Sequence, residues 1–516
     1  MTNKTFIIGL DGTTFDVLNP LIADGLMPNI QRLISMGSSG ELRSTVPPIS
    51  GTSWLSFATG KNPKKTGAYD FLKFDRKTKK LSGVSSNDFK GHSFWDIIEK
   101  DNKKIGLLHM PMLFPPYEID GFMISGIGSS ENWDISFPKE LKQELTKYCQ
   151  EKLITDIHYN QPHYDEDKFI GELNSVFDQK VKIAKYLIKE KQWDLFIWVI
   201  SETDWIQHFM WKHIDESHPD YDKEKSLIYQ KKFDEFWGRV DKAIGEVLDM
   251  LPTDINLIIN SDHGFGKNDQ TFNINAWLKA GGFLVLESSR WKNTGRKLLR
   301  FINKYLPINR IITIKQTAID YEKSQAYDPG HTIPFGGIYI NTKNQKIKKS
   351  KKQIIEQLIL EFKKTEEEFG IKFNIVETDE KWKNAPDLIV TINDCRCVVN
   401  KTDFSSLIFK NQSFSPRHTG SHRMNGIFIA KGPNIRQTKI ENASLVDIAP
   451  TVLHLFGNKI PSDIDGRVLS EIFTPDWLTQ RQIVTSDKTN ESIDSSRADK
   501  GREDELKQKL KDLGYM

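Results

Sequence analysis

The sequence is poor in cysteine. Its three cysteines, Cys149, Cys395 and Cys397, are too few and too unevenly spaced among 516 residues for a disulfide framework. Cys395 and Cys397 lack the second half of a zinc-binding spacing, so we assign no metal to them. Chains without disulfides are typical of reducing compartments, and we therefore expect a cytoplasmic location.

The sequence also lacks a long hydrophobic run and an excess of charge of one sign. No segment approaches the roughly 20 apolar residues of a membrane span, and the N-terminus shows no signal peptide pattern. The 72 Lys and Arg residues nearly balance 69 Asp and Glu, for a formal net charge of +3. Because the lysines are scattered rather than striped, we expect no nucleic-acid partner. The sequence carries no signal for the oligomeric state.

Short apolar runs of strand length recur along the chain. They are "TFIIGL" (5–10), "KIGLLHM" (104–110), "WDLFIWVIS" (193–201), "INLIINSDHG" (255–264), "PDLIVTIND" (386–394) and "GIFIAKGP" (426–433). Amphipathic stretches of helical period lie between several of them, as at 231–251. Strands that alternate with helices predict an α/β fold with a doubly wound, mostly parallel sheet.

Three regions depart from this alternation, and the end of the chain departs from it too. Residues 70–98, 132–175 and 270–335 are polar or irregular, and we expect them to be insertions above the carboxyl ends of the strands. Residues 1–474 would then form one large domain. Residues 475–516 are predicted to be a polar linker followed by a charged C-terminal helix.

Side chains with metal-binding chemistry recur at the ends of the apolar runs. Ligands of open parallel sheets bind at the carboxyl ends of the strands, so these residues mark a candidate site. They are Asp11, Asp204 and His208 in "SETDWIQH", Asp262 and His263 in "SDHG", and His418 and His422 in "RHTGSHRMNG", which precedes the last run.

Each of these pieces has an ordinary structural explanation on its own. Asp204 and His208 are four residues apart, as a solvated pair on one helix face would be. Asp-His-Gly also suits a turn. Together they favour a metal site, because Asp and His are zinc ligands and a buried cluster of carboxylates is costly without cations.

The segment "PPISGTSWLSFATG" (47–60) places three hydroxyl side chains where a helix is predicted to begin. Ser50, Thr52 and Ser53 are all favoured N-cap types, so a cap is the ordinary interpretation. A serine at a helix start also presents a phosphate to free backbone N–H groups, here those of Gly51 and Thr52. Local sequence leaves both roles open.

These segments together resemble the type I phosphodiesterase/nucleotide pyrophosphatase branch of the alkaline phosphatase superfamily. The matching pieces include "GLDGTTFDVLNPLIADGLMPNIQRL", "PPISGTSWLSFATGKNPKKTGAYDF", "DWIQHFMW", "SDHGFG", "GSHRMNGIFIAKGP" and "DIAPTVLHLFGNKIPSDIDGRVL", in family order from residue 5 to about 470. The resemblance implies an alkaline phosphatase-like catalytic domain over residues 1–474.

The resemblance also implies two divalent metal ions, zinc or, as the alternative, manganese, since Asp/His sites accept both. The ligands matched to one ion are Asp204, His208 and His422, with His418 as the alternative to the last. The ligands matched to the other ion are Asp11, Asp262, His263 and the nucleophile Ser50.

The nucleophile is placed by its distance from the "TG" that opens "TGKNP". Nine residues before Thr59 lies Ser50, and Thr52 is the alternative. The eukaryotic-type members carry an Asn shortly after the nucleophile to hold a phosphate oxygen, and this chain has none there. We therefore expect Gly51, Thr52 and Lys61 to contact the substrate.

The leading hypothesis is a metal-dependent hydrolase that cleaves a phosphodiester or pyrophosphate through a covalent phosphoserine. The expected substrate is a small phosphate ester, of which nucleotides and nucleotide sugars are examples. A phosphomonoesterase or phosphomutase of the same superfamily is the alternative enzyme. A non-catalytic binding protein on this fold is a third hypothesis, disfavoured by the complete set of site residues.

Overall fold

The computed structural model describes residues 4–487 apart from 130–132, 158–163, 288–318, 331–333, 342–348, 380, 383, 405–407, 413–414 and 416. Its larger lobe is built on a ten-stranded sheet of order β20-β2-β19-β9-β1-β8-β5-β6-β7, with β21 beside β2. The strands are β1 Thr5–Leu10, β2 Ser38–Arg43, β5 Ile105–Met110, β6 Gly121–Ser125, β7 Ser136–Phe137, β8 Leu195–Ile200, β9 Asn256–Asn260, β19 Asn425–Lys431, β20 Thr438–Lys439 and β21 Ala443–Ser444.

Five central strands, β9, β1, β8, β5 and β6, run parallel. All residues of β1, β8 and β9 are buried, as expected for apolar strands covered on both faces. The prediction of an α/β fold with a mostly parallel sheet is confirmed.

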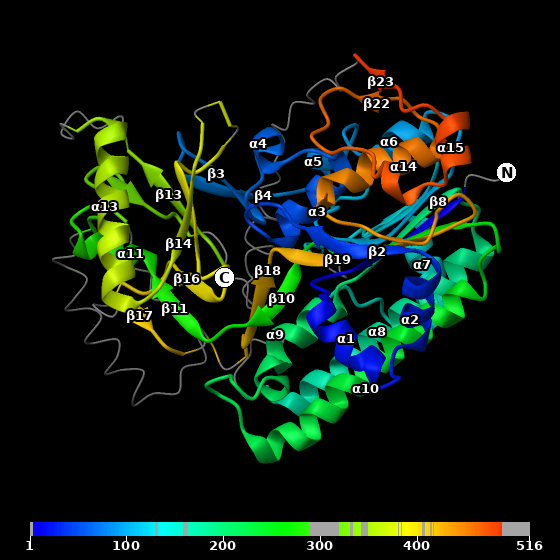
Figure 1. Cartoon of the computed structure of the whole chain (residues 1–516), viewed down its shortest axis with the longest axis horizontal. Coiled ribbons are helices and arrows are strands. Elements are labelled where there is room, and N and C mark those ends of the chain that lie inside the picture. The colour runs from blue at the N-terminus through cyan, green and yellow to red at the C-terminus, as the bar shows by residue number, and fades with distance from the viewer. Residues whose placement is uncertain are drawn as a thin grey trace.

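Helices cover both faces of this sheet (Figure 1). Those on one face are α1 Phe15–Ala23, α2 Pro28–Met36, α7 Glu140–Cys149, α8 Glu166–Glu190, α9 Glu202–Ile214 and α10 Lys223–Leu248. Those on the other are α3 Ser50–Thr59, α5 Ser86–Phe89, α6 Phe94–Glu99, α14 Ile448–Phe456 and α15 Pro475–Gln480, with α4 Pro63–Thr66 following α3.

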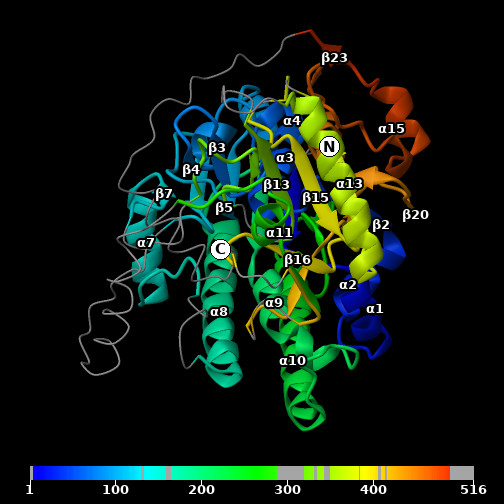
Figure 2. The same ribbon diagram turned by 90° about the vertical axis from the view of Figure 1, so that its left-hand side faces the viewer.

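A smaller second lobe has its own sheet, of order β12-β13-β15-β16-β11-β17 with β14 beside β15 (Figures 1 and 2). Its elements are β11 Gln270–Asn273, α11 Ile274–Ala280, β12 Ala326–Tyr327, β13 Gly336–Ile340, α13 Lys351–Phe369, β14 Phe373–Glu377, β15 Leu388–Ile392, β16 Cys397–Asn400 and β17 Phe409–Lys410. The described residues of segment 270–335 contribute β11, α11 and β12, and β13 to β17 follow after residue 335, so the inserted lobe extends well beyond the range expected from the sequence.

Two apolar runs behave differently from the expectation. The run at 386–394 forms β15, which pairs with β13, β14 and β16, so its assignment to the central sheet is wrong. A fully buried run is apolar on both faces in either sheet, and its pattern therefore cannot identify its partners. The run at 426–433 does join the central sheet as β19, but antiparallel to β9 and β2.

Segment 70–98 ties the two lobes together. It contains the hairpin of β3 Leu72–Asp75 and β4 Lys80–Gly83. Phe74 is 2% exposed and belongs to the apolar core of the second lobe. Beyond it, Arg76 Nη1 donates to Asp387 at 2.9 Å, and Lys79 Nζ donates to the hydroxyl of Tyr327 at 2.7 Å. The hairpin is therefore an arm of the larger lobe that docks on the smaller one.

Segment 132–175 does not form a cap over the strand ends among its described residues. It supplies β7, which pairs antiparallel with β6 at the edge of the central sheet, then α7 and the start of α8. Residues 158–163 lie outside the described residues. The apolar side chains of α7, such as Leu141 and Leu145, are buried, which places this segment in the helical layer.

The boundary expected at 474 also moves. α15 buries Trp477 to 5% exposure, and β23 Thr485–Ser486 pairs with β22 Ile460–Pro461. Residues 475–487 therefore belong to the folded body, because they add apolar surface and backbone pairing to it. Residues 488–516, with the predicted C-terminal helix, lie outside the described residues.

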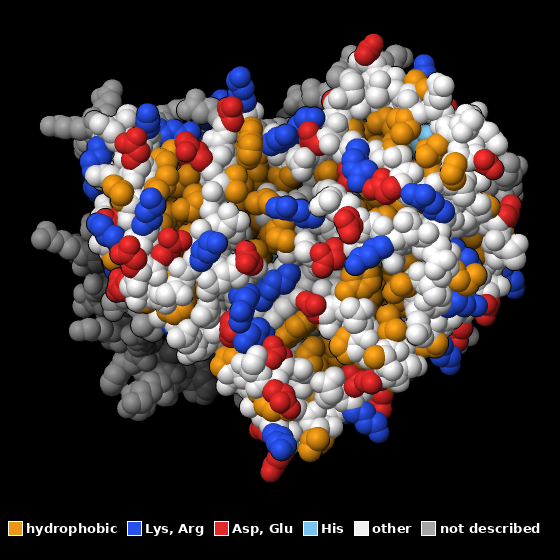
Figure 3. Space-filling view, in the orientation of Figure 1, with side chains coloured by type: hydrophobic (Ala, Val, Ile, Leu, Met, Phe, Trp, Pro, Cys, Tyr) orange, Lys and Arg blue, Asp and Glu red, His pale blue; other side chains and the backbone are white. Residues whose placement is uncertain are grey.

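No helix of the described part of the chain has the length and apolar content needed to cross a bilayer. On the face drawn in Figure 3, basic and acidic side chains are interspersed over both lobes.

Candidate metal centre

The candidate site lies at the carboxyl edge of the parallel strands. The predicted ligands meet there from four elements: Asp11 after β1, Asp204 and His208 in α9 after β8, Asp262 and His263 after β9, and His422 in β18 Gly420–Arg423, which precedes β19. Because β19 is antiparallel, its start lies at this edge. A residue before that run therefore reaches the same site as residues that follow the others.

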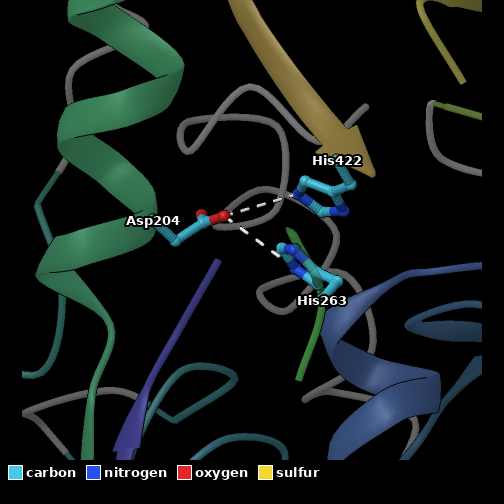
Figure 4. Close-up of side chains that lie close together, drawn as sticks. All are labelled: Asp204, His263 and His422. Atoms are coloured by element: carbon cyan, nitrogen blue, oxygen red, sulfur yellow. Dashed lines mark ion pairs between the residues drawn. The ribbon is translucent and has the colours of Figure 1, made fainter. Parts of the chain in front are cut away.

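Asp204, His208 and His422 form a first group. His208 Nε2 lies 3.4 Å from Asp204 Oδ2, which confirms that the two side chains share one face of α9. His422 Nε2 lies 3.5 Å from Asp204 Oδ1 and 3.0 Å from His208 Nε2. Figure 4 shows Asp204 reaching from α9 toward His422 and His263.

Asp11, Asp262, His263 and Ser50 form a second group. His263 Nε2 lies 3.6 Å from Asp11 Oδ1 and 3.4 Å from Asp262 Oδ2. Ser50 Oγ lies 3.1 Å from His263 Nε2 and 3.5 Å from Asp11 Oδ1. The two groups adjoin, because Asp204 Oδ1 is 4.0 Å from His263 Nε2.

The three imidazoles are oriented in the same way. Each Nδ1 lies near a backbone carbonyl oxygen: His208 near Gly420 at 2.9 Å, His422 near Pro48 at 2.8 Å and His263 near Gly264 at 3.0 Å. A carbonyl accepts only from N–H, so Nδ1 carries the proton and Nε2 presents its lone pair to the cluster. Nε2 of His208 and Nε2 of His422 lie 3.0 Å apart, close enough for both to bind one cation.

Burial shifts the pKa values of acids and imidazoles in this cluster toward their uncharged forms. Burial, reinforced by Asp262 and Asp204, raises the pKa of Asp11 well above its ordinary value. Burial likewise raises the pKa of Asp262 to about 7. Burial, with His422 adding to it, lowers the pKa of both His208 and His263 well below 6.5, so these two imidazoles supply no positive charge. Positive charge from outside the chain would stabilise the carboxylates.

The donor set fits two divalent cations. Two ligand atoms about 2.0–2.1 Å from a tetrahedral zinc ion lie roughly 3.4 Å apart. Within the two groups, the Asp–His and His–His ligand atoms lie between 3.0 and 3.6 Å apart. Asp262 Oδ2 accepts no hydrogen bond within the described residues. Carboxylate and imidazole donors do not by themselves separate zinc from manganese.

Ser50 is the first residue of α3 rather than its cap. Ile49 occupies the N-cap position, and its carbonyl accepts from the N–H groups of Thr52 at 2.9 Å and Ser53 at 2.7 Å. The cap interpretation of Ser50 is therefore wrong, and its hydroxyl faces Asp11 and His263 instead. The Thr52 N–H is already engaged, so the expectation that it is free for phosphate is also wrong.

The other predicted substrate contacts are placed unevenly. Gly51 packs on Phe71 so closely that a Cβ would lie 2.9 Å from the Phe71 Cα, which only glycine allows. The Thr52 hydroxyl is buried and has no partner in the described chain. Lys61 lies beyond the far end of α3, about 15 Å from Ser50 at 1.5 Å per residue, and pairs with Asp463. The structure does not bring Lys61 to the site.

Sequence reasoning missed the residues that hold the ligands in place. Trp54 Nε1 donates to Asp11 Oδ2 at 3.1 Å, and Gln207 Nε2 donates to the Gly12 carbonyl at 3.0 Å. Trp54 follows Ser50 by four residues, a spacing that places both on one helix face and gave a usable signal. His418 stacks on His208, with ring centres 4.1 Å apart, whereas His422 supplies the nitrogen beside Asp204.

Comparison with known proteins adds the following. A family model described as type I phosphodiesterase/nucleotide pyrophosphatase matches residues 5–403. No curated protein matches the chain. Human ectonucleotide pyrophosphatase/phosphodiesterase 5 is similar in structure, with 13% identity, a TM-score of 0.52, and 91% of this chain and 100% of that chain covered.

Two further solved structures carry small ligands. An inactive variant of the murine form of that protein, in complex with AMP, has 11% identity, a TM-score of 0.50 and coverage of 91% and 100%. Phosphonoacetate hydrolase from Sinorhizobium meliloti 1021, in complex with phosphonoformate, has 12% identity, a TM-score of 0.53 and coverage of 88% and 95%. At these identities the likeness shows the fold.

Proposed function

We propose that this chain, which belongs to the type I phosphodiesterase/nucleotide pyrophosphatase family, is a two-metal hydrolase that cleaves a phosphodiester or pyrophosphate through a phosphoserine at Ser50. The family predicted from the sequence is confirmed, and it is one of phosphodiesterase-type hydrolases. The observation that carries the finer proposal is the spacing of the buried ligand atoms beside Ser50 Oγ.

Two cations fit the two groups of side chains. Asp204, His208 and His422 would hold one, and Asp11, Asp262 and His263 would hold the other together with Ser50. When bound, such ions lower the pKa of a coordinated hydroxyl and neutralise charge on the transferring phosphoryl group. Zinc is the ion that we propose, with manganese as the alternative.

Ser50 is the proposed nucleophile. Its Oγ attacks phosphorus, the bond from phosphorus to the leaving oxygen breaks, and Ser50 carries the phosphoryl group while its hydroxyl proton passes through solvent to the leaving oxygen. Water then attacks the same phosphorus, the Oγ–P bond breaks, and Ser50 regains its hydroxyl. Ser50 starts α3, where the helix dipole and the Gly51 N–H favour the negative charge of the phosphoryl oxygens.

His263 offers a second way to activate Ser50, because its Nε2 lone pair lies 3.1 Å from the hydroxyl. His263 Nε2 also lies 3.6 Å from Asp11 Oδ1 and 3.4 Å from Asp262 Oδ2, which is the spacing of ligand atoms that share one tetrahedral ion. We therefore assign His263 to the cation and not to the proton of Ser50.

The proposed substrate is a small phosphate ester. AMP, bound in one related structure, is a phosphate ester, and phosphonoformate, bound in another, is a small phosphonate. We retain Gly51 and Thr52 as proposed substrate contacts and a cytoplasmic location as part of the proposal. All three cysteines are free and buried, which suits a reducing compartment.

The test combines metal analysis with two chromogenic esters. Purified protein, dialysed against metal-free buffer after loading with Zn²⁺, is expected to retain two ions per chain. It is expected to hydrolyse bis-(p-nitrophenyl) phosphate faster than p-nitrophenyl phosphate. A preference for the monoester would favour the phosphomonoesterase or phosphomutase alternative. Protein that holds no metal and cleaves neither ester would refute the enzyme proposal.

A further inference from the structure

A buried ion pair lies behind the ligand-bearing end of α9. Lys180 Nζ of α8 is 2.6 Å from Glu202 Oε1 in the first turn of α9, and the two side chains are 2% and 0% exposed. Lys180 Nζ also lies 4.9 Å from the ring centre of Trp205. Burying both charges carries a desolvation cost that the attraction often only matches, so stability alone does not account for the pair.

The Lys180–Glu202 pair lies at the first turn of α9. Glu202 precedes Asp204 by two residues, and the N-cap residue Ser201 makes no side-chain capping bond. Without such a cap, the rotation and height of the first turn depend on contacts to neighbouring elements. A carboxylate in the first turn also interacts favourably with the helix dipole.

The opposite side of this turn is tied to the loop after β1. Thr203 Oγ1 donates to the Asp11 carbonyl at 2.7 Å, and Gln207 Nε2 donates to the Gly12 carbonyl at 3.0 Å. The ion pair between Lys180 and Glu202 connects the same turn to α8. Together these contacts hold the helix from two sides, and Asp204 and His208 are carried on it.

We propose that the Lys180–Glu202 pair is a positioning device for the cation held by Asp204, His208 and His422. By fixing the first turn of α9 against α8, it keeps Asp204 Oδ1 and His208 Nε2 at 3.5 and 3.0 Å from Nε2 of His422, which comes from another element, β18. The second group depends on it less, because Asp11, Asp262 and His263 follow β1 and β9. This inference rests on the proposed two-metal site.

The chain provides a matched control. Lys212 and Glu166 pair at 2.8 Å and join the same two helices at the other end of α9, with side chains 14% and 16% exposed. If the buried pair only fastens α9 to α8, loss of either pair has the same consequence for metal binding. If the buried pair positions ligands, only its loss weakens one ion.

The experiment titrates metal-free full-length protein with Zn²⁺ against a chromophoric chelator, which resolves two affinities without measuring turnover. In Lys180→Met, one affinity is expected to fall at least about tenfold and the other to stay within twofold. Lys180→Arg, which keeps the charge, is expected to recover most of the loss. Lys212→Met is expected to leave both affinities within twofold.

The double variant Lys180→Met/Glu202→Leu protects the test against misfolding, because apolar replacement of a buried pair is often neutral for stability. It is expected to unfold at a temperature near that of the wild type and still to bind one ion at least tenfold more weakly. Wild-type affinity for both ions in this variant, or equal weakening of both ions, would overturn the positioning role. A wild-type protein that binds fewer than two ions would instead overturn the proposed function itself, and the positioning role with it.

Discussion

Two buried carboxylates, one in each lobe, are neutralised in different ways. In the second lobe, Asp387 is 2% exposed, and it pairs with Arg76 at 2.9 Å, with Lys351 at 2.9 Å and with the N–H of Ile340 at 2.6 Å. In the larger lobe, Asp262 is fully buried, and its Oδ1 accepts from the Gly12 N–H at 3.2 Å.

The difference lies in where the positive charge comes from. The second lobe neutralises Asp387 with its own and the hairpin's basic side chains. Among the described residues, no Lys or Arg pairs with Asp11 or Asp262, and their neighbours include another acid and the imidazole of His263, whose pKa burial lowers. A carboxylate that the chain neutralises itself is structural, whereas carboxylates gathered without such partners mark a place for cations.

The largest effect is expected when the proposed nucleophile at the carboxyl edge of the parallel strands is replaced. Ser50→Ala removes the nucleophile, and turnover of bis-(p-nitrophenyl) phosphate is expected to fall about a thousandfold or more. Metal content should stay at two ions per chain, because Asp11, Asp262 and His263 remain. Turnover near that of the wild type would remove Ser50 from this role and point to Thr52.

A smaller but still large effect is expected when one ligand is lost. His208→Ala removes a nitrogen that lies 3.4 Å from Asp204 Oδ2, and the protein is expected to lose one of two bound ions by elemental analysis. His418→Ala is the control, since His418 stacks on His208 but does not supply the nitrogen beside Asp204. Loss of one ion in the control variant would instead make His418, the alternative to His422, a ligand.

An intermediate effect is expected for a residue that only orients a ligand. Trp54→Phe keeps an aromatic ring but loses the N–H that donates to Asp11 Oδ2. Loss of such an orienting bond typically weakens metal binding by about 10- to 100-fold. Chelator competition would measure this as weaker binding of one ion; unchanged affinity would show that the bond is dispensable.

The second lobe is expected to respond in stability and not in metal binding. Arg76→Met breaks the ion pair with Asp387, and because the arginine side chain is 40% exposed the expected loss in free energy of unfolding is about 1 kcal/mol. Urea denaturation checks this, and elemental analysis should still find two ions. Loss of an ion would contradict the separation of the two lobes' roles.

The smallest effect is expected at Lys61. Lys61→Met breaks a mostly buried pair with Asp463 at the far end of α3, away from Ser50, so kcat and KM are expected to stay within twofold. Steady-state kinetics with the diester checks this. A KM raised tenfold or more would return Lys61 to the substrate site.

Much of the site could be predicted because its signals are local. Asp11 and Asp262 stand directly after buried apolar runs, and the spacing of Asp204 and His208 specifies one helix face. Lys61 misled because nearness in sequence to Ser50 is not nearness in space when a helix of ten residues intervenes. The Lys180–Glu202 pair joins two helices that become neighbours only when the chain folds, so no local sequence pattern predicts it.

The amino-acid sequence by itself determined the α/β class, the candidate ligands and the hydroxyl beside them, since strand burial, helix period and side-chain chemistry are local properties. Tertiary structure alone decided that β15 belongs to a second sheet and that β19 runs antiparallel. The antiparallel direction of β19 brings His422, which precedes that strand in the sequence, to the carboxyl edge of the parallel strands. Tertiary structure also decided which buried charges are neutralised by the chain. Pairing and charge compensation depend on which distant segments meet, and an apolar run is equally buried in either sheet.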